Sequence, residues 1–218
     1  MRLLTFLLLD IETTPHITAV WGLWARTRWC RPSLSSHRLT WTPRGTKACA
    51  MTKDPTSDAE LQRLATKVGA LLMDSERRLV TAESCTGGWI AKVMTDIPGS
   101  SGWFLGGIVA YSNTLKQSLL GVLPSTLHAH GAVSEASARE MAIGALETLG
   151  GQVAVAVTGI AGPDGAQPGK PVGTVWFGWA WRADGEIETR VSLETFSGDR
   201  EAVRRQTVAR ALNELLRG

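Results

Sequence analysis

The hydrophobic positions from Ser57 onward follow the helical period in five stretches of the chain. In the first stretch, apolar residues recur every three or four positions, and Ser57 and Glu60 before them form a capping-box pair. Ser134 and Asp199 stand in the same place before two later stretches, where a serine or an aspartate caps a helix. The pattern predicts helices over residues 57–72, 87–96, 113–120, 134–149 and 199–216. Asn113 is the predicted cap of the third.

Between these helices lie shorter apolar runs that are typical of buried strands. Asp184 and Gly185 separate two of them, and this dipeptide favours the tight turn of an antiparallel hairpin. The runs predict strands over residues 79–82, 104–111, 153–157, 172–181 and 187–196. Strands that alternate with helices predict an α/β fold, a layered α/β/α sandwich with a mixed, mainly parallel sheet.

The first fifty residues differ from the rest of the chain in charge. They hold seven Lys/Arg and two Asp/Glu, a net charge of +5, whereas residues 51–218 hold sixteen and eighteen, a net charge of −2. Four of the nine tryptophans also lie before Met51, although too few apolar residues accompany them to build a separate core. The sequence therefore predicts a domain over 51–218 and a leader over 1–50. The leader is interpreted as disordered, as a gene-fusion remnant or as a wrongly assigned start.

The leader contains two features that could be mistaken for functional segments. The apolar run Leu3–Leu9 is too short to span a bilayer, and the absence of a small-residue cleavage site after it argues against a signal peptide. The string DIETTP resembles the first acidic motif of DEDD-type 3′–5′ exonucleases, in which Asp10 and Glu12 would hold metal ions. Two-metal chemistry needs further carboxylates that the chain does not supply, so a nuclease is the least favoured interpretation.

The cysteines carry little evidence of a redox or metal function. Cys30, Cys49 and Cys85 show no CxxC spacing, so neither a zinc knuckle nor a redox dithiol is indicated. Few cysteines and no export signal predict a cytoplasmic location. Because the positive charge belongs to the leader, no nucleic-acid partner is expected for the domain, and no membrane partner either.

The segment Ala82–Gly88 places Ser84 and Cys85 between a predicted strand and a predicted helix. Backbone N–H groups at a helix start bind an oxyanion or a phosphate, and the two glycines that end the segment let a ligand approach closely. Ser84 is the candidate nucleophile, with Cys85 as its rival, because a helix start also stabilises a thiolate. Alternatively, Ser84 or Thr86 only caps the helix.

A second candidate pair is Tyr111, at the end of a predicted strand, and Lys116, in the first turn of the next helix. A lysine in a first turn opposes the helix dipole, so it requires another explanation. A lysine with a lowered pKa acts as a general base toward a serine. The alternative is a solvated lysine beside a buried tyrosine.

Two glycine-rich segments, Thr158–Gly165 and Lys170–Thr174, flank predicted strands. They are interpreted as the walls of one pocket or, alternatively, as tight surface turns. Neither is a Walker loop, because the glycine spacing differs and Pro171 stands where a serine or threonine is required.

Two further groups of side chains are candidate ligands. Arg200, at the start of the last predicted helix, is a candidate phosphate ligand, or alternatively an exposed arginine paired with Glu201. His128 and His130 have no carboxylate or cysteine ligand near them in the sequence, so no metal site is predicted.

Taken together, these segments resemble the CinA C-terminal, or PncC, family of nicotinamide mononucleotide amidohydrolases. The strings AESCTGG, AYSNTLKQSLLGV, HGAVSE, VTGIAGPDG, KPVGTVWF and FSGDREAVRRQ occur in the order and spacing of that family over about residues 57–217. The resemblance implies hydrolysis of the nicotinamide mononucleotide carboxamide to nicotinic acid mononucleotide and ammonia, a step of pyridine nucleotide salvage, with no cofactor. It implies a small-molecule nucleotide as partner and leaves homo-oligomerisation open.

The resemblance also implies roles for single residues. Ser84 is implied as the nucleophile, Lys116 as the base that takes its proton, and Tyr111 as the residue that relays or orients that proton. N–H groups at the helix start near Gly87 and Gly88 are expected to stabilise the oxyanion. The implied substrate contacts are Thr86, Gly87, Gly88, Asn113, Thr158, Gly159 and Arg200.

Residues 1–50 match nothing in that family, so the family's stand-alone form, without an N-terminal nucleotide-processing domain, is the better comparison. The alternative function is a catalytically silent module that binds a nucleotide and regulates another process.

Overall fold

The structure is a computed structural model that describes residues 54–217, so the leader, with its Leu3–Leu9 run, Asp10 and Glu12, lies outside the described residues. A five-stranded sheet forms the centre of the described part, in the order β2-β1-β3-β4-β5. The strands are β1 (Leu79–Glu83), β2 (Phe104–Val109), β3 (Val153–Gly159), β4 (Thr174–Ala183) and β5 (Glu186–Thr195).

The direction of each strand follows from its pairing. β1 pairs in parallel with β2 on one side and with β3 on the other. β4 pairs antiparallel with β3 and with β5, so β4 alone runs against the other four strands. The predicted mixed sheet is confirmed, as is the hairpin around Asp184 and Gly185 that joins β4 to β5.

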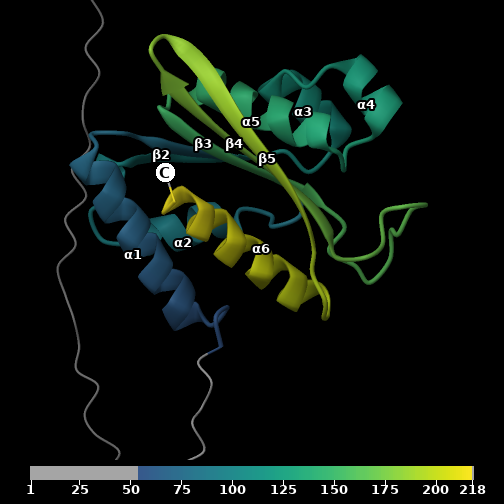
Figure 1. Cartoon of the computed structure of the whole chain (residues 1–218), viewed down its shortest axis with the longest axis horizontal. Helices are drawn as coiled ribbons and strands as arrows, with labels where there is room; N and C mark the ends of the chain where they lie inside the picture. The colour runs from purple at the N-terminus through teal and green to yellow at the C-terminus, as the bar shows by residue number, and fades with distance from the viewer. Residues whose placement is uncertain (1–53, 218) are drawn as a thin grey trace, which may run out of the picture. The chain divides into compact units, whose positions relative to one another are not determined.

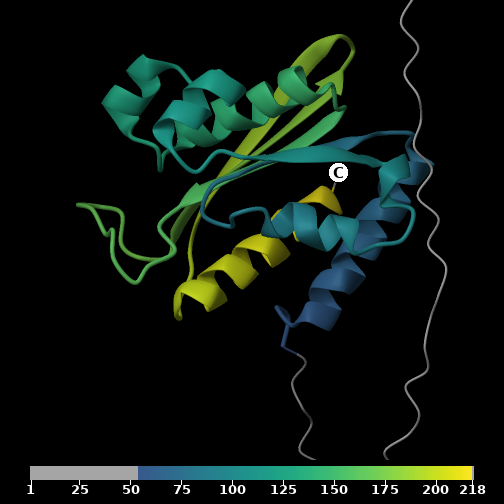
Figure 2. The same ribbon diagram turned by 180° about the vertical axis from the view of Figure 1, so that it is seen from behind.

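Helices cover both faces of the sheet, as Figures 1 and 2 show. One face carries α1 (Asp58–Asp74), α2 (Trp89–Thr95) and α6 (Arg200–Leu215), and the other carries α3 (Asn113–Leu120), α4 (Pro124–His130) and α5 (Glu135–Leu149). A short 3-10 turn, η1 (Ser100–Gly102), precedes β2. The predicted α/β/α sandwich is therefore confirmed. Within residues 54–217, no helix combines the length and the apolar content needed to cross a bilayer.

Successive side chains of β3 point to opposite faces of the sheet. Val155 and Val157 belong to the core beneath α1, α2 and α6. Ala154 and Ala156 belong to the core beneath α5, where their small size lets the helix approach the sheet. Gly178 of β4 also lets α5 lie close to the sheet, because a Cβ at this position would collide with the backbone carbonyl of Ala138 in α5.

The ends of the helices test the capping predictions. Ser57, Ser134 and Asp199 each accept a hydrogen bond from the N–H three residues ahead, which confirms them as N-caps. The prediction for the third helix is wrong by one residue. Ser112 caps α3 by accepting from the Leu115 N–H at 3.2 Å, and Asn113 is the first helical residue. The sequence pattern did not predict α4 or η1.

Candidate active site

Three parallel strands end at one edge of the sheet, and the residues at those ends line one pocket. Ser84 directly follows β1, Tyr111 lies two residues beyond β2, and Gly159 ends β3. Because these strands are neighbours and parallel, segments far apart in the sequence meet at this edge, the usual ligand position in such sheets. The pocket is lined by Ser84, Cys85, Tyr111, Asn113, Lys116, Ala132, Val133, Thr158, Gly159, Ala161 and Arg200.

Three of the residues that sequence analysis assigned to the substrate do not line this pocket. Thr86 is fully buried, and its hydroxyl donates to the Glu83 carboxylate at 2.7 Å. Gly87 and Gly88 face a separate depression beside Trp89 of α2. These three residues form the turn behind Ser84, whereas the other assigned side chains converge on the pocket itself.

A hydrogen bond between two side chains of the pocket joins Ser84 and Lys116. The Lys116 Nζ donates to the Ser84 Oγ at 2.9 Å and to the Ala110 carbonyl at 2.7 Å. The lysine is only 1% exposed although its side chain carries an amine. Burial lowers the pKa of Lys116 below its ordinary value, and the nearby Cys85 opposes this shift to a smaller extent. The neutral amine, the form that accepts a proton from serine, therefore forms more readily than in a free lysine.

Cys85, the rival nucleophile, lies in a different electrostatic environment. Burial raises the pKa of its thiol to about 12, and the negative charge of Glu83 contributes to the rise. A thiol with such a pKa is protonated near neutral pH, and the thiolate is the nucleophilic form of cysteine. The local environment thus favours Ser84 over Cys85 as the attacking group.

Tyr111 and Arg200 form a second contact at the mouth of the pocket. The Arg200 Nη2 donates to the Tyr111 hydroxyl at 3.1 Å, and its Nη1 donates to the Gly162 carbonyl at 2.7 Å. Tyr111 is 61% exposed and makes no hydrogen bond to Ser84 or Lys116. The expected proton relay through Tyr111 therefore has no direct contact in the structure, while the tyrosine does hold the arginine.

The N–H groups available to an oxyanion differ from those expected. Glu83 accepts hydrogen bonds from the N–H groups of Ile90 and Ala91, in the first turn of α2, at 2.9 and 2.8 Å. The N–H groups of Cys85 and Thr86, next to Ser84 in the chain, hydrogen-bond the sulfur of Cys85 and act to lower the pKa of its thiol, against the larger effect of burial. A ligand oxyanion that takes up these two donors would replace a contact with sulfur, which is a weak acceptor.

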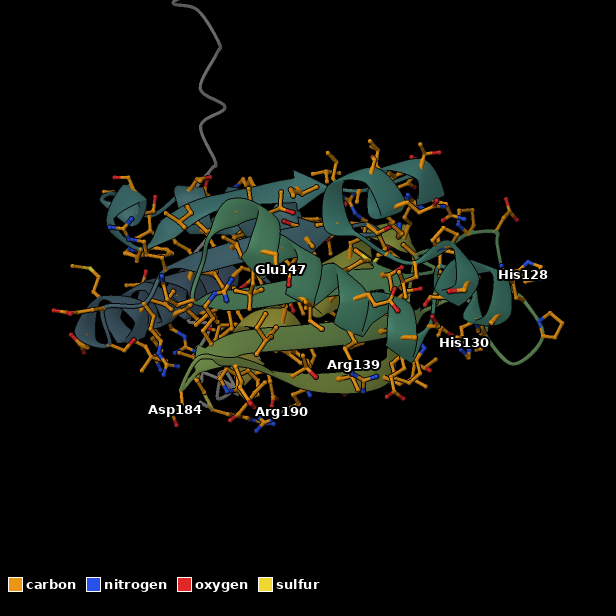
Figure 3. All side chains as sticks on the ribbon, turned by 90° about the horizontal axis from the view of Figure 1, so that it is seen from above. His128, His130, Arg139, Glu147, Asp184 and Arg190 are labelled. Atoms are coloured by element: carbon orange, nitrogen blue, oxygen red, sulfur yellow. The ribbon has the colours of Figure 1, made fainter. Side chains whose placement is uncertain are left out.

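Glu83 is the residue of this site that sequence analysis missed. A charged residue at the end of a fully buried strand was the available signal, because such a residue requires partners. His128 and His130 lie at the end of α4, where Figure 3 labels them. Both are exposed, and neither lines the pocket. In the described range, 54–217, no three His, Cys, Asp or Glu side chains form a group suited to a metal ion.

Comparison with known proteins gives the family. The model of the CinA C-terminal domain matches residues 61–218. A protein of Escherichia coli (strain K12) named nicotinamide-nucleotide amidohydrolase PncC is 55% identical over 159 residues, which cover 73% of this chain and 94% of that protein. A Pseudomonas putida protein of the same name is 51% identical over 155 residues, covering 70% and 93%.

A solved structure agrees with these relatives. The crystal structure of the competence damage-inducible protein A (ComA) from Klebsiella pneumoniae matches with a TM-score of 0.67 and 39% sequence identity, and covers 72% of this chain and 95% of that chain. Relatives more than 50% identical place the chain among the amidohydrolases. With a family model that matches most of its length, the chain belongs to the CinA C-terminal domain family.

Proposed function

We propose that the chain hydrolyses the carboxamide of nicotinamide mononucleotide to give nicotinic acid mononucleotide and ammonia. The observation that carries the proposal is the 2.9 Å contact between a buried lysine amine and the Ser84 hydroxyl, in a pocket at the carboxyl edge of the parallel strands. A serine paired with a neutral lysine is a nucleophile for acyl transfer. The name of the relatives, nicotinamide-nucleotide amidohydrolase, supports a nicotinamide nucleotide as the substrate class.

The proposed reaction has two halves with an ester between them. In the first half, the Ser84 Oγ attacks the amide carbon while the Lys116 amine takes the hydroxyl proton. The N–H groups of Cys85 and Thr86 stabilise the oxyanion, in exchange for their contacts with the Cys85 sulfur. The C–N bond then breaks, and the Lys116 ammonium returns its proton to the departing ammonia. In the second half, water attacks the ester carbon while Lys116 takes a proton from that water. The bond between the acyl carbon and the Ser84 oxygen then breaks, and Lys116 returns the proton to that oxygen.

The remaining lining residues serve to bind the nucleotide. Arg200 supplies a positive charge at the pocket mouth for the phosphate, and the Tyr111 hydroxyl holds its guanidinium in place. We propose that Asn113, Thr158 and Gly159 contact the rest of the substrate. Thr158 also braces the opposite wall, because its hydroxyl donates to the Ala132 carbonyl at 2.8 Å.

Arg200→Ala is expected to raise KM for nicotinamide mononucleotide on the order of 10- to 100-fold, the range for losing a hydrogen bond to a charged group. kcat should change much less, because Arg200 does not contact Ser84 or Lys116. Steady-state kinetics would measure both constants. The reverse pattern, with kcat lowered and KM unchanged, would show that Arg200 acts on the reacting atoms.

The function itself is tested by incubating the purified chain with nicotinamide mononucleotide and separating the products by chromatography. Ammonia and nicotinic acid mononucleotide are expected in equal amounts. Saturable binding of the nucleotide without product, by a chain that melts cooperatively, would instead identify the silent regulatory module and overturn the proposal.

A protein that begins at Met51 is expected to melt at the same temperature as the full chain and to have the same specific activity. The buried core of residues 54–217 begins at Leu61 and includes contributions from both faces of the sheet. The capping interaction of Ser57, which starts α1, also lies within the shorter protein. Thermal melting and an ammonia assay on both proteins would check this. A large loss of either property would show that the first fifty residues are structural.

A further inference from the structure

The carboxylate of Glu83 makes three of its four hydrogen bonds to the turn and the helix start that follow Ser84. Glu83 is 1% exposed and is the last residue of β1, immediately before the serine. One oxygen accepts from the Ile90 N–H at 2.9 Å and from the Thr86 hydroxyl at 2.7 Å. The other accepts from the Ala91 N–H at 2.8 Å and from the Thr81 hydroxyl at 3.4 Å. Four donors surround this group, which is the arrangement of an ionised carboxylate.

These bonds close the turn that presents the nucleophile. The N-cap position of α2 is Gly88, which has no side chain to satisfy the first N–H groups of the helix. Glu83 satisfies two of them from the far end of the turn, and its negative charge lies at the positive end of the helix. The turn from Ser84 to Gly88 is therefore tied at both ends to a single buried side chain.

We infer that Glu83 is a positioning residue for the reaction, which holds the Ser84 turn against the Lys116 amine. The inference rests on the proposed function of the same pocket. Glu83 does not itself line that pocket, so it acts through Ser84 and the turn rather than on the substrate.

A second effect of the same carboxylate concerns the neighbouring thiol. The charge of Glu83 adds to burial in raising the pKa of Cys85, and so helps to keep this residue protonated. Loss of the charge, together with loosening of the turn, makes Cys85 more reactive. The thiol thus reports on Glu83 without any need for substrate turnover.

Glu83→Gln tests the inference, because glutamine keeps the size of the side chain but cannot keep its bonds. Each carboxylate oxygen accepts from a backbone N–H, so in either orientation the glutamine amide places an NH₂ group against a donor. kcat is expected to fall on the order of 100-fold, the effect of a small displacement of a reacting group, with KM changed by less than about threefold.

Glu140→Gln is the matched control. Glu140 of α5 accepts from the Leu123 N–H at 2.9 Å and from the Thr126 hydroxyl at 2.6 Å, at the start of α4, and does not line the pocket. The same chemical change at this second helix start is expected to leave kcat and KM unaltered. Both variants are assayed well below their melting temperatures, so that unfolding does not contribute.

The rate of Cys85 alkylation by iodoacetamide is measured in parallel, in a chain that also carries Cys30→Ser and Cys49→Ser. Glu83→Gln is expected to lower the pKa of the Cys85 thiol and so to accelerate alkylation, on the order of tenfold for each pKa unit. Glu140→Gln is expected to leave the alkylation rate unchanged. If the wild type does not hydrolyse nicotinamide mononucleotide, the proposed function fails, and the alkylation rates alone decide the role of Glu83. Equal alkylation rates in the two variants, or equal kcat where the wild type is active, would overturn the inference.

Thr86→Val provides a second variant should Glu83→Gln not fold. Valine has the shape of threonine and removes only the 2.7 Å hydrogen bond to the carboxylate. kcat is expected to fall on the order of tenfold with KM nearly unchanged, the loss of one charged hydrogen bond appearing in the chemical step. A wild-type kcat, together with wild-type Cys85 alkylation, would contradict the positioning role.

Discussion

Ser84→Ala is expected to lower kcat for ammonia release on the order of 10⁵-fold, the effect of removing a nucleophile from a hydrolase. The fold should survive, because the change removes one oxygen atom and Lys116 keeps its hydrogen bond to the Ala110 carbonyl at 2.7 Å. The melting temperature is therefore expected to stay within a few degrees, about 3 °C, of the wild type. An ammonia assay and a thermal melt of the same preparation measure the two quantities.

Cys85→Ala is the natural control for this experiment, since Cys85 adjoins Ser84 and lines the same pocket. It is expected to keep most of the activity. An active Ser84→Ala protein beside an inactive Cys85→Ala protein would reverse the assignment and make the thiol the nucleophile.

Lys116→Met is expected to lower kcat on the order of 10³-fold, within the range for a lost general base. Methionine fills a similar volume but accepts no proton, so the Ser84 hydroxyl would have to attack without losing its proton. The Ala110 carbonyl also loses its hydrogen bond, so some loss of stability is expected. Measuring kcat together with a denaturation curve separates the two effects.

The pH profile of the wild type gives a second measurement on the same lysine. Because burial lowers the pKa of Lys116, the neutral amine forms at a lower pH than in a free lysine, whose pKa is about 10.4. The rate should therefore rise with pH through an apparent pKa below that of free lysine. A profile that stays flat from about pH 6 to 10, with an active Lys116→Met protein, would exclude Lys116 as the base.

The same shift has a consequence for stability, with a sign opposite to that of a lysine in an ion pair. Between the lowered folded pKa and the free value of about 10.4, the unfolded chain binds a proton at Lys116 that the folded chain has released. The free energy of unfolding therefore rises with pH through this window. Below it, the buried ammonium destabilises the folded state, and the Lys116→Met protein should lack this dependence.

Those parts of the fold that depend on neighbouring residues could be predicted from the sequence. Ser57, Ser134 and Asp199 cap helices through bonds to a backbone N–H only three residues away, so a local pattern contains the information. α4 was missed because its start is held by Glu140, which lies fourteen residues from Thr126 and belongs to another helix. A contact of that kind leaves no periodic trace in the sequence.

The candidate site divides in the same way. The pairing of Ser84 with Lys116 was expected from the family resemblance, and the structure places the two atoms within hydrogen-bond distance. The hydroxyl of Thr86 was expected at the substrate but bonds to Glu83 instead. A threonine before two glycines looks the same in the sequence whether it faces a ligand or a buried carboxylate, so only the packing of β1 against α2 distinguishes them.

The convergence of three parallel strand ends means that the active centre is a property of the assembled sheet and of no smaller unit. Ser84 comes from β1, Lys116 follows β2, and Thr158 belongs to β3, which joins the sheet more than seventy residues after β1. A chain in which β1 and β2 have paired but β3 has not holds the serine and the lysine without a wall for the substrate. Turnover therefore requires the long-range pairing of β1 with β3, and a chain without that pairing is expected to be inactive.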